Sequence, residues 1–263
     1  MERGPRTNNC LFLDALLWMA RSGGRWRNLP ERFGAYQSVK RRYYRWIEMD
    51  VLDGMLVVLA READLEWLMI DSTIVRAHQR AAGARKIKGG RMPKALGPSR
   101  GGLTTKIHAA TYALGQPVRL IATPGQRNDI ALAHDLIDGI EAGALLAEKG
   151  CDANHLIEKM EETNIEAVIP PKRDRKVKRL YDVALYKERN CIERFFSKLK
   201  QFRRVATRYD KLLRNFTGFV KLAAIAIWLK YLIRHHALAG AYCAYRSAST
   251  KSLKAGEAWR DIG

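Results

Sequence analysis

Apolar positions recur along this chain with two different periods, and together they predict an α/β fold that begins with helices. Apolar side chains follow helical spacing over residues 11–20, and Ser22-Gly23-Gly24 predicts the end of that helix. Further along, short apolar or alternating segments predict strands, and helical spacing returns between and after them. The predicted strands are 66–73, 103–112, 117–123, 144–147 and 167–170, and the predicted helices between them are 129–140 and 153–163. Asn128 or Asp129 is the expected N-cap of the first of these two helices.

The charge of the chain narrows the choice of partner. The sequence has 47 Lys and Arg residues against 27 Asp and Glu residues, a formal net charge of +20 in 263 residues. That excess exceeds what solubility requires and favours a polyanion, nucleic acid before an anionic membrane. The glycine-rich, basic segment 76–102 is too long for an ordinary loop, so we expect it to join two strands and contact a DNA backbone. Residues 172–179 form a second basic loop.

Cysteines and apolar runs exclude several other classes of protein. Cys10, Cys151, Cys191 and Cys243 are scattered without a C-x-x-C pair, so we expect free thiols in a reducing cytosol rather than a zinc site or disulfides. The apolar run after Arg6 is interrupted by Asp14, which argues against a signal peptide. The run 219–233 contains two lysines and is expected to be a core helix rather than a membrane span. These features predict a soluble, cytoplasmic protein.

A basic helix in the first 65 residues is the candidate DNA-binding element. It is expected to begin near Ser38, after a turn at Gly34, and its aromatic residues alternate with its cations. The cations are Lys40, Arg41, Arg42 and Arg45. In a helix-turn-helix such a helix lies in the major groove with its cations near phosphates. The alternative is a small helical bundle whose surface happens to be basic.

The stretch 186–200 carries the most specific pattern. On a continuous helix its polar residues would share one narrow arc, beside an apolar stripe suited to packing on a sheet. The polar residues are Tyr186, Arg189, Glu193 and Lys200. The alternative is an amphipathic helix with a solvated face. The pattern Tyr-x2-Arg-x3-Glu-x6-Lys resembles the signature of the DDE transposases of small bacterial insertion sequences, in the branch related to insertion sequence 5, and the following QFRRVATRYDKLLRNF is also similar to that family.

The resemblance implies a domain organisation. Residues 66–233 would form a ribonuclease-H-like catalytic domain, with which the predicted order of strands and helices agrees. Residues 1–65 would form a helix-turn-helix-like DNA-binding domain, shortened at its start relative to the family. Residues 234–263 are expected to be a weakly structured tail.

The resemblance also implies the site. In IDSTIVRAHQ, Asp71 matches the first catalytic aspartate, and Glu193 matches the third acidic residue. The second acidic position falls on Glu148 in AEKGCD, where the family has an aspartate. Asp152 is the alternative ligand, although it is also a good N-cap for the following helix. The extra methylene of Glu148 would displace the carboxylate by up to about 1.5 Å and weaken catalysis.

The chemistry implied is metal-dependent phosphoryl transfer on DNA. Asp71, Glu148 and Glu193 would hold two Mg²⁺ ions, which Mn²⁺ could replace. Arg189 and Lys200 would bind phosphates, and Tyr186 would stack on a base or bond a phosphate. For His78 and His108 we expect structural or phosphate-contacting roles.

The predicted function is that of an insertion-sequence transposase. It would bind the terminal inverted repeats of its element, cleave and transfer DNA strands with Mg²⁺, and act as a homodimer on the nucleoid DNA of a bacterium. One alternative is a decayed, catalytically inactive derivative that only occupies such ends, which the altered second acidic residue, the shortened start and the unusual tail suggest. Another is a ribonuclease-H-like nuclease without strand transfer.

Overall fold

The computed structural model describes residues 8–61, 66–83, 95–99, 101–176 and 178–234. The chain divides into two compact units, Met1–Ile225 and Ala226–Gly263. The candidate site lies in the first unit. Residues 84–94 and 100 of the predicted basic insertion and residues 235–263 of the predicted tail lie outside the described residues.

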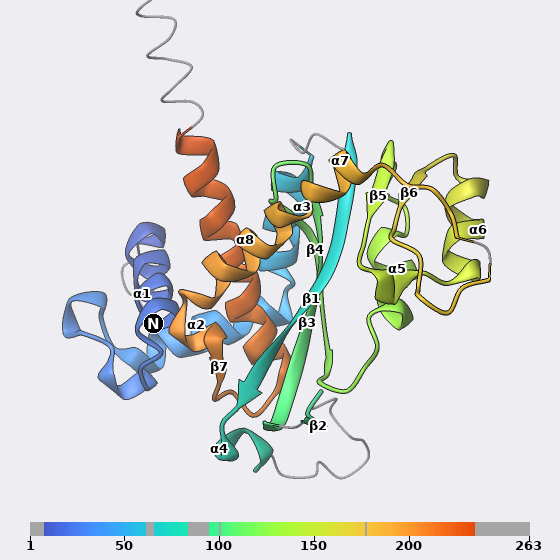
Figure 1. Cartoon of the computed structure of the whole chain (residues 1–263). Helices are drawn as coiled ribbons and strands as arrows, with labels where there is room; N and C mark the ends of the chain where they lie inside the picture. The colour runs from blue at the N-terminus through green and yellow to red at the C-terminus, as the bar shows by residue number, and fades with distance from the viewer. Residues whose placement is uncertain (1–7, 62–65, 84–94, 100, 177, 235–263) are drawn as a thin grey trace, which may run out of the picture. The chain divides into compact units, whose positions relative to one another are not determined.

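A mixed sheet forms the centre of the first unit (Figure 1). Its five main strands are β1 (Trp67–Ala77), β3 (Gly102–Tyr112), β4 (Pro117–Pro124), β5 (Ala144–Leu146) and β6 (Glu166–Val168). In space they follow the order β4-β3-β1-β5-β6, with β1, β3 and β4 antiparallel and β5 and β6 parallel to β1. Two short strands, β2 (Gly97–Ser99) and β7 (Thr207–Arg208), pair with β3 and β1. This order is that of the ribonuclease-H-like fold, which confirms the predicted fold class.

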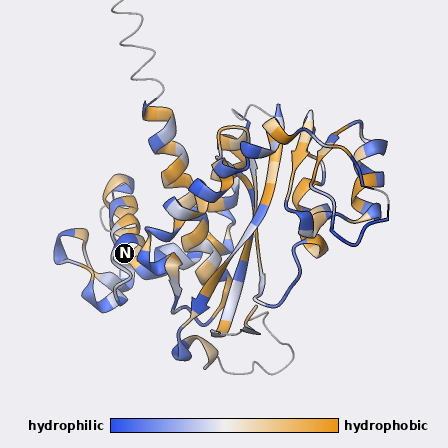
Figure 2. Ribbon diagram, viewed as in Figure 1, coloured by the Kyte–Doolittle hydropathy of each residue, from blue (hydrophilic) through white to orange (hydrophobic). Residues whose placement is uncertain are grey.

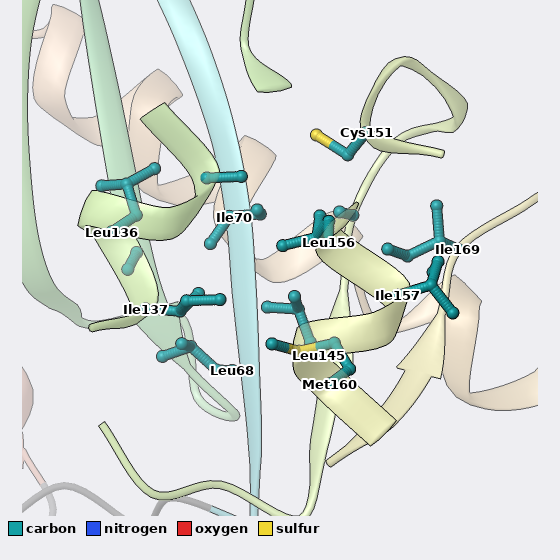
Figure 3. Close-up of a cluster of buried hydrophobic side chains, with 13 residues drawn as sticks. Leu68, Ile70, Leu136, Ile137, Leu145, Cys151, Leu156, Ile157, Met160 and Ile169 are labelled. Atoms are coloured by element: carbon teal, nitrogen blue, oxygen red, sulfur yellow. The ribbon is translucent and has the colours of Figure 1, made fainter. Parts of the chain in front are cut away.

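The hydrophobic core joins two helices to one face of this sheet. α5 (Ile130–Ile137) and α6 (Asn154–Glu162) pack their apolar faces on β1 and β5, where Figure 2 shows apolar residues concentrated along the central strands. Leu68, Leu136, Leu145 and Leu156 meet in this cluster, and each is nearly fully buried (Figure 3). Burying each leucine side chain stabilises the fold by about 1.5–3 kcal/mol, so truncation at Leu156 would loosen both β5 and α6.

The opposite side of β1 faces α8 (Asn190–Lys200), as Figure 1 shows. Successive strand residues point to opposite faces, so Ile70 enters the core with α5 and α6 while Asp71 points the other way. The turn between β3 and β4 also approaches α8 closely. Gly115 there has φ +76°, and a Cβ atom on it would lie 2.8 Å from the carbonyl oxygen of Cys191. Only glycine fits this turn without strain, so the hairpin and α8 are held together.

The N-terminal region is helical, as predicted, but its second helix starts earlier. It contains α1 (Asn9–Ser22), two 3₁₀ turns (Trp26–Asn28 and Glu31–Phe33), α2 (Tyr36–Glu48) and α3 (Val51–Ala60). Gly23 ends α1 in the left-handed conformation at φ 66°, which confirms the predicted stop. The Tyr43 hydroxyl on α2 donates to the Asn215 carbonyl at 2.8 Å, and its ring lies 4.6 Å from that of Phe219. These contacts bind the helical region to the body of the first unit.

The last helix, Leu213–Arg234, is the one described helix long and apolar enough to cross a membrane by length and composition. Buried core helices pass the same test. The part of this helix in the first unit is buried, with Phe216 and Phe219 fully inaccessible, as the core-helix prediction requires.

Candidate active site

Strand register brings two of the predicted acidic residues to the same level. Met69 on β1 pairs with Leu146, the last residue of the parallel strand β5. Asp71 and Glu148 each lie two residues further along, so they reach the same edge of the sheet. The predicted strand 66–73 is longer in the structure, because β1 continues to Ala77 by pairing with β3. Asp71 lies within β1, just beyond the residues that pair with the parallel strand β5.

One arginine joins all three predicted carboxylates. The Nη1 of Arg189 donates to Oδ2 of Asp71 at 3.0 Å, and its Nη2 donates to Oε1 of Glu148 and Oε1 of Glu193, both at 2.9 Å. The partners come from β1, from the turn after β5 and from α8. We call these four residues the carboxylate centre. The Glu148 carboxylate lies as close to Arg189 as the Glu193 carboxylate does, so the extra methylene of glutamate relative to aspartate does not keep it out of the centre.

Negative charge exceeds positive charge in the carboxylate centre. Three carboxylates face one guanidinium, which leaves two negative charges uncompensated. Burial raises the pKa of Asp71, and Glu148 and Asp129 add to the rise, while the Ser72 amide and Arg189 oppose it. Burial alone would lower the pKa of Arg189, but the carboxylates outweigh it and the pKa is raised. The centre therefore favours additional positive charge.

The stretch 186–200 is two helices rather than one. α7 (Val183–Lys187) ends before Glu188, and α8 begins at Asn190, with Arg189 in its N-cap position. The carbonyls of Glu188 and Arg189 accept from residues three positions ahead, at 2.8 and 3.1 Å, as in a tight 3₁₀ turn. The buried stripe of α8 consists of Cys191, Ile192, Phe195, Phe196 and Leu199, and its packing turns Glu193 toward β1.

The other signature residues separate into two groups. The Arg189 guanidinium carbon lies 5.8 Å from the Tyr186 ring centre, a cation–π distance, so Tyr186 borders the carboxylate centre. Lys200 is exposed and lies two helical turns beyond Glu193, about 10 Å along α8. Lys200 is therefore outside the centre and available to a longer partner such as a DNA strand.

Asp152 is turned away from the carboxylate centre. Its buried carboxylate accepts from the Lys172 amide at 2.8 Å, Nε of Arg175 at 2.7 Å and Nη2 of Arg179 at 2.6 Å. The N-cap prediction was wrong. Ala153 occupies the N-cap position of α6 and no side chain caps it, because the Asp152 carboxylate is directed to the basic loop. Between the two alternatives for the second acidic position, only Glu148 joins Asp71 and Glu193.

A fourth acidic residue near the centre was not recognised from the sequence. Asp129, one of the two predicted N-cap residues, occupies the N-cap position of α5, but its side chain makes no capping hydrogen bond. Its Oδ1 lies 3.3 Å from Nζ of Lys106 and 3.4 Å from Nδ1 of His108. Asp129, His108, Asp71 and Glu148 line one small cavity. Burial lowers the pKa of His108 to about 4, so this ring is neutral at physiological pH. The register between β3 and β1 pairs His108 with Ser72, the residue after Asp71, and this pairing brings His108 and its partner Asp129 near Asp71.

The remaining predicted residues have structural surroundings. His78 accepts a hydrogen bond from the Arg80 amide at 3.2 Å and stacks on Tyr209. Cys151, where the family pattern has a tyrosine, is a buried free thiol, and burial raises its pKa to about 12. Cys10 and Cys191 are also free, which confirms the thiol prediction for the described cysteines.

The basic helix α2 borders a groove of about 950 Å³ against α1. Arg41, Arg42 and Arg45 line it, and Arg41 and Arg45 are exposed. Arg42 donates to Oδ1 of Asn9 and lies over the Phe12 ring at 4.2 Å, so it also holds α1 and α2 together. Lys40 lies 5.6 Å from the Tyr44 ring centre. The four predicted cations thus lie on one helix but differ in exposure, since Arg41 and Arg45 are exposed whereas Arg42 contacts α1.

The carboxylate centre fits a divalent cation in donor type and charge. Carboxylate oxygens are the ligands Mg²⁺ and Mn²⁺ favour, and the uncompensated charge matches one such ion. Among the described residues no group of three His, Cys, Asp or Glu side chains is arranged around a common metal position. The reason lies in the contacts themselves, since the carboxylates converge on the Arg189 guanidinium.

Comparison with known proteins places the chain in a family. Residues 63–229, more than half of the chain, match the transposase DDE domain, and residues 2–56 match the putative transposase of the IS4/5 family. The putative transposase for insertion sequence element IS6501 of Brucella ovis is 41% identical over 131 residues, 49% of this chain and 100% of that protein. The uncharacterized protein y4sN of Sinorhizobium fredii is 85% identical over 94 residues, 36% of this chain and 75% of that protein.

Among solved structures, the Mos1 transposase paired-end complex with left transposon end aligns at 13% identity and a TM-score of 0.26, over 87% of this chain and 81% of that one. The family matches agree with the resemblance seen in the signature residues, and DNA and a divalent metal ion are the partner and cofactor that transposases of this family use. The chain belongs to the DDE-domain transposases and is an insertion-sequence DNA transposase.

Proposed function

We propose that this transposase binds the terminal inverted repeats of its element and cleaves and joins DNA strands at the carboxylate centre, with Asp71, Glu148 and Glu193 as the metal ligands. The observation that carries the proposal is the convergence of these three side chains, from three separate elements, on one guanidinium at 2.9–3.0 Å. If the polar side chains of α8 formed only a solvated helix face, they would not contact carboxylates from β1 and from the turn after β5.

The proposed cofactor is Mg²⁺, as two ions, with Mn²⁺ as a substitute. When bound, such ions activate a water or 3′-hydroxyl and stabilise the leaving oxygen. The protein supplies the oxygen ligands and a partly buried environment for Asp71, whose side chain is 14% exposed. Low exposure strengthens electrostatic attraction to a cation.

Arg189, Tyr186 and Lys200 are proposed to bind the DNA strand. Arg189 is the only one of the three in contact with the carboxylates among the described interactions, so it lies closest to the reacting phosphate in the proposed arrangement. Its planar fork suits a phosphate as well as a carboxylate. Tyr186 would contact the adjacent nucleotide, and Lys200 a phosphate further along α8.

The N-terminal helices are proposed to recognise the repeats. We assign DNA binding to residues 1–65 and catalysis to residues 66–233. Lys40, Arg41, Arg42 and Arg45 on α2 would contact phosphates around the groove against α1. The enzyme is proposed to work as a homodimer on DNA in the bacterial cytoplasm, associated with the nucleoid.

A cleavage assay tests the catalytic proposal. A labelled duplex carrying one element end is incubated with the full chain, with Mg²⁺ or with EDTA. We expect Mg²⁺-dependent cleavage followed by joining of the 3′-hydroxyl end to target DNA, and loss of both in Asp71→Asn. Binding without cleavage would support the inactive derivative, and cleavage without joining would support a nuclease.

A binding assay tests the DNA-reading helix. Replacing the exposed Arg41 and Arg45 with alanine should weaken binding to the repeat duplex. The slope of log K against log salt concentration should become shallower by about 2, because each phosphate contact contributes about 0.9 to that slope. The matched control replaces Arg25 and Arg27 with alanine. Both are exposed and lie outside the groove, so their replacement removes the same charge. Equal effects of the two pairs would mean that the groove is not the reading surface.

A further inference from the structure

Asp152 has an unusual number of charged partners for a buried residue. Its side chain is only 1% exposed, yet it receives two guanidiniums and one backbone amide, all at 2.6–2.8 Å. Arg175 also donates to Oδ1 of Asn154 at 2.9 Å, which fixes it at a second point. Burial alone would raise the pKa of Asp152, but the bonds from Arg175, the Lys172 amide and Arg179 lower it to about 2. We call Asp152 with these three donors the clamp.

The clamp fixes the loop after β6, residues 172–176, which has no side chains packed in the hydrophobic core. The loop follows β6, and its side chains between Lys172 and Lys176 are polar and charged, so no apolar packing fixes them. Charge-assisted hydrogen bonds are about twice as strong as neutral ones, and three of them meet on one carboxylate. The conformation of the loop therefore depends on Asp152.

The clamp lies next to the carboxylate centre. Asp152 follows Glu148 by one 3₁₀ turn (Lys149–Cys151), and the Cys151 amide donates to the Glu148 carbonyl at 2.8 Å. Cys151 lines the same small cavity as Asp71 and Glu148. Besides burial, Asp71 and Glu148 raise the pKa of the Cys151 thiol and Lys172 opposes them, so all three charges lie near this side chain. The loop therefore begins at the edge of the proposed active site.

The loop presents cations that the clamp does not use. Arg173 and Lys176 are exposed, while Arg175 and Arg179 are turned inward to Asp152. Two guanidiniums on one carboxylate leave the clamp itself positive, so it adds to the field of the exposed cations. Exposed cations on a loop held beside the proposed phosphoryl-transfer centre would suit the phosphates that flank the reacting one.

We infer that Asp152 is a positioning residue, which holds the loop so that Arg173 and Lys176 contact DNA phosphates beside the carboxylate centre. This inference rests on the proposed function, since it needs DNA at that centre. It also gives a reason for an acidic residue four positions after Glu148 that is not itself a metal ligand.

The sign of one substitution separates positioning from simple electrostatics. Asp152→Asn makes the chain one unit more positive, so charge alone predicts tighter binding to DNA. Positioning predicts the reverse, because the released loop must be ordered again on binding and its phosphate contacts weaken. We expect about tenfold weaker binding to the repeat duplex and a salt slope lower by about 2, the contribution of two phosphate contacts.

The experiment compares Asp152→Asn with Asp174→Asn in the full chain. Asp174 is exposed in the same loop, so its substitution changes the charge equally without touching the clamp. The probe is a labelled duplex of the element's terminal inverted repeat, titrated at several salt concentrations. Brief trypsin digestion provides a second readout, since release of the loop should expose cleavage after Arg175 and Lys176 in Asp152→Asn alone.

A second pair keeps the test decisive if Asp152→Asn does not fold. Arg175→Gln removes one arm of the clamp but leaves Arg179 and the Lys172 amide in place, whereas Arg173→Gln removes an exposed cation of the same loop. We expect faster trypsin cleavage only in Arg175→Gln, and weaker DNA binding in both.

Three outcomes are possible. Weaker binding and faster cleavage in Asp152→Asn, with Asp174→Asn binding at least as well as the wild type, supports the inference. Folded Asp152→Asn that binds as tightly as Asp174→Asn overturns it and leaves the proposed function intact. Absence of binding by the wild type overturns the proposed function, and the inference with it.

Discussion

The carboxylate centre and the clamp are built from the same chemical groups in opposite proportions. In the centre three carboxylates share Arg189, and Glu148 and Glu193 are 53% and 56% exposed. In the clamp Asp152 alone is shared by Arg175 and Arg179 and is 1% exposed. The pKa of Asp71 is raised, first by burial, whereas that of Asp152 is lowered to about 2 by its donors.

The difference teaches which acidic residues are suited to chemistry. A buried carboxylate that already accepts from two guanidiniums and one amide has its charge compensated and little attraction left for a metal ion, and breaking its contacts releases the structure around it. Carboxylates that must share a donor remain electrostatically unsatisfied, and exposed oxygens can take a new cation. Residue type alone would not have separated Glu148 from Asp152, whereas the exposed fraction of the side chain and the ratio of donors to acceptors both do.

The largest expected effect comes from removing one charge of the centre. Glu193→Gln should lower the rate of Mg²⁺-dependent cleavage by about 1000-fold, since a metal ligand supports several kcal/mol of transition-state stabilisation. DNA binding should stay within a few-fold. The measurement is single-turnover cleavage of the element-end duplex, and Glu188→Gln, an exposed residue in the turn before α8, is the matched control. Equal rates for the two variants would mean that the centre is a structural ion pair.

Glu148→Asp tests whether the unusual glutamate fits this centre. In the structure its longer side chain reaches the Arg189 guanidinium at 2.9 Å, so shortening it withdraws the carboxylate by about 1.5 Å. We expect cleavage to fall by about 100-fold, because a misplacement near 1 Å can cost that much. Cleavage kinetics at saturating Mg²⁺ measure it. A faster variant would instead support the expectation from the family pattern that an aspartate suits this position better.

Arg189→Gln should distinguish the two networks by their response to metal. It leaves three carboxylates without their shared cation, and we expect a loss of about 2 kcal/mol of stability in metal-free buffer, reduced from fully buried values because two partners are half-exposed. Mn²⁺ at one hundred times its Kd for this variant would add about 2.7 kcal/mol of stability, which offsets that loss.

Thermal unfolding with and without Mn²⁺ measures this response. Arg194→Gln, on the same helix but bonded to the Cys191 sulfur, is the matched control. Asp152→Asn retains the whole carboxylate centre, so Mn²⁺ should stabilise it no more than it stabilises the wild type, whereas Arg189→Gln should gain more than the wild type does. Equal gains by the two variants would mean that the two networks do not differ in their response to metal.

The smallest expected effect is the pH dependence of the clamp. The folded pKa of Asp152, about 2, lies below its ordinary value of 3.8. The clamp therefore stabilises the fold fully above pH 4, and this stability is lost as the pH falls toward 2. A shift of this size corresponds to about 2 kcal/mol. Urea unfolding at pH 5 and pH 2.5 measures it, and the Asp152-dependent part of the loss should be absent in Asp152→Asn.

The sequence by itself determined the elements and the chemical class of the site. Apolar periodicity identified the five main strands and the helices between them, because burial on one face imposes a period that needs no knowledge of partners. The signature residues pointed to three acidic positions. Local sequence even recorded the end of α1, since Gly23 adopts a conformation that other residues avoid.

Tertiary structure alone decided which acidic groups meet. Asp152 has the local sequence of an N-cap, but donors 20 to 27 residues away compete for its carboxylate and win. Asp129 joins the edge of the site through Lys106 and His108, which strand register brings near and periodicity cannot. The stretch 186–200 looked continuous because helical spacing tolerates a turn, yet the break at Glu188 places Arg189 among the three carboxylates. Pairing partners are set by long-range packing, and a linear pattern of residue types contains the period of each element but not the distances between them.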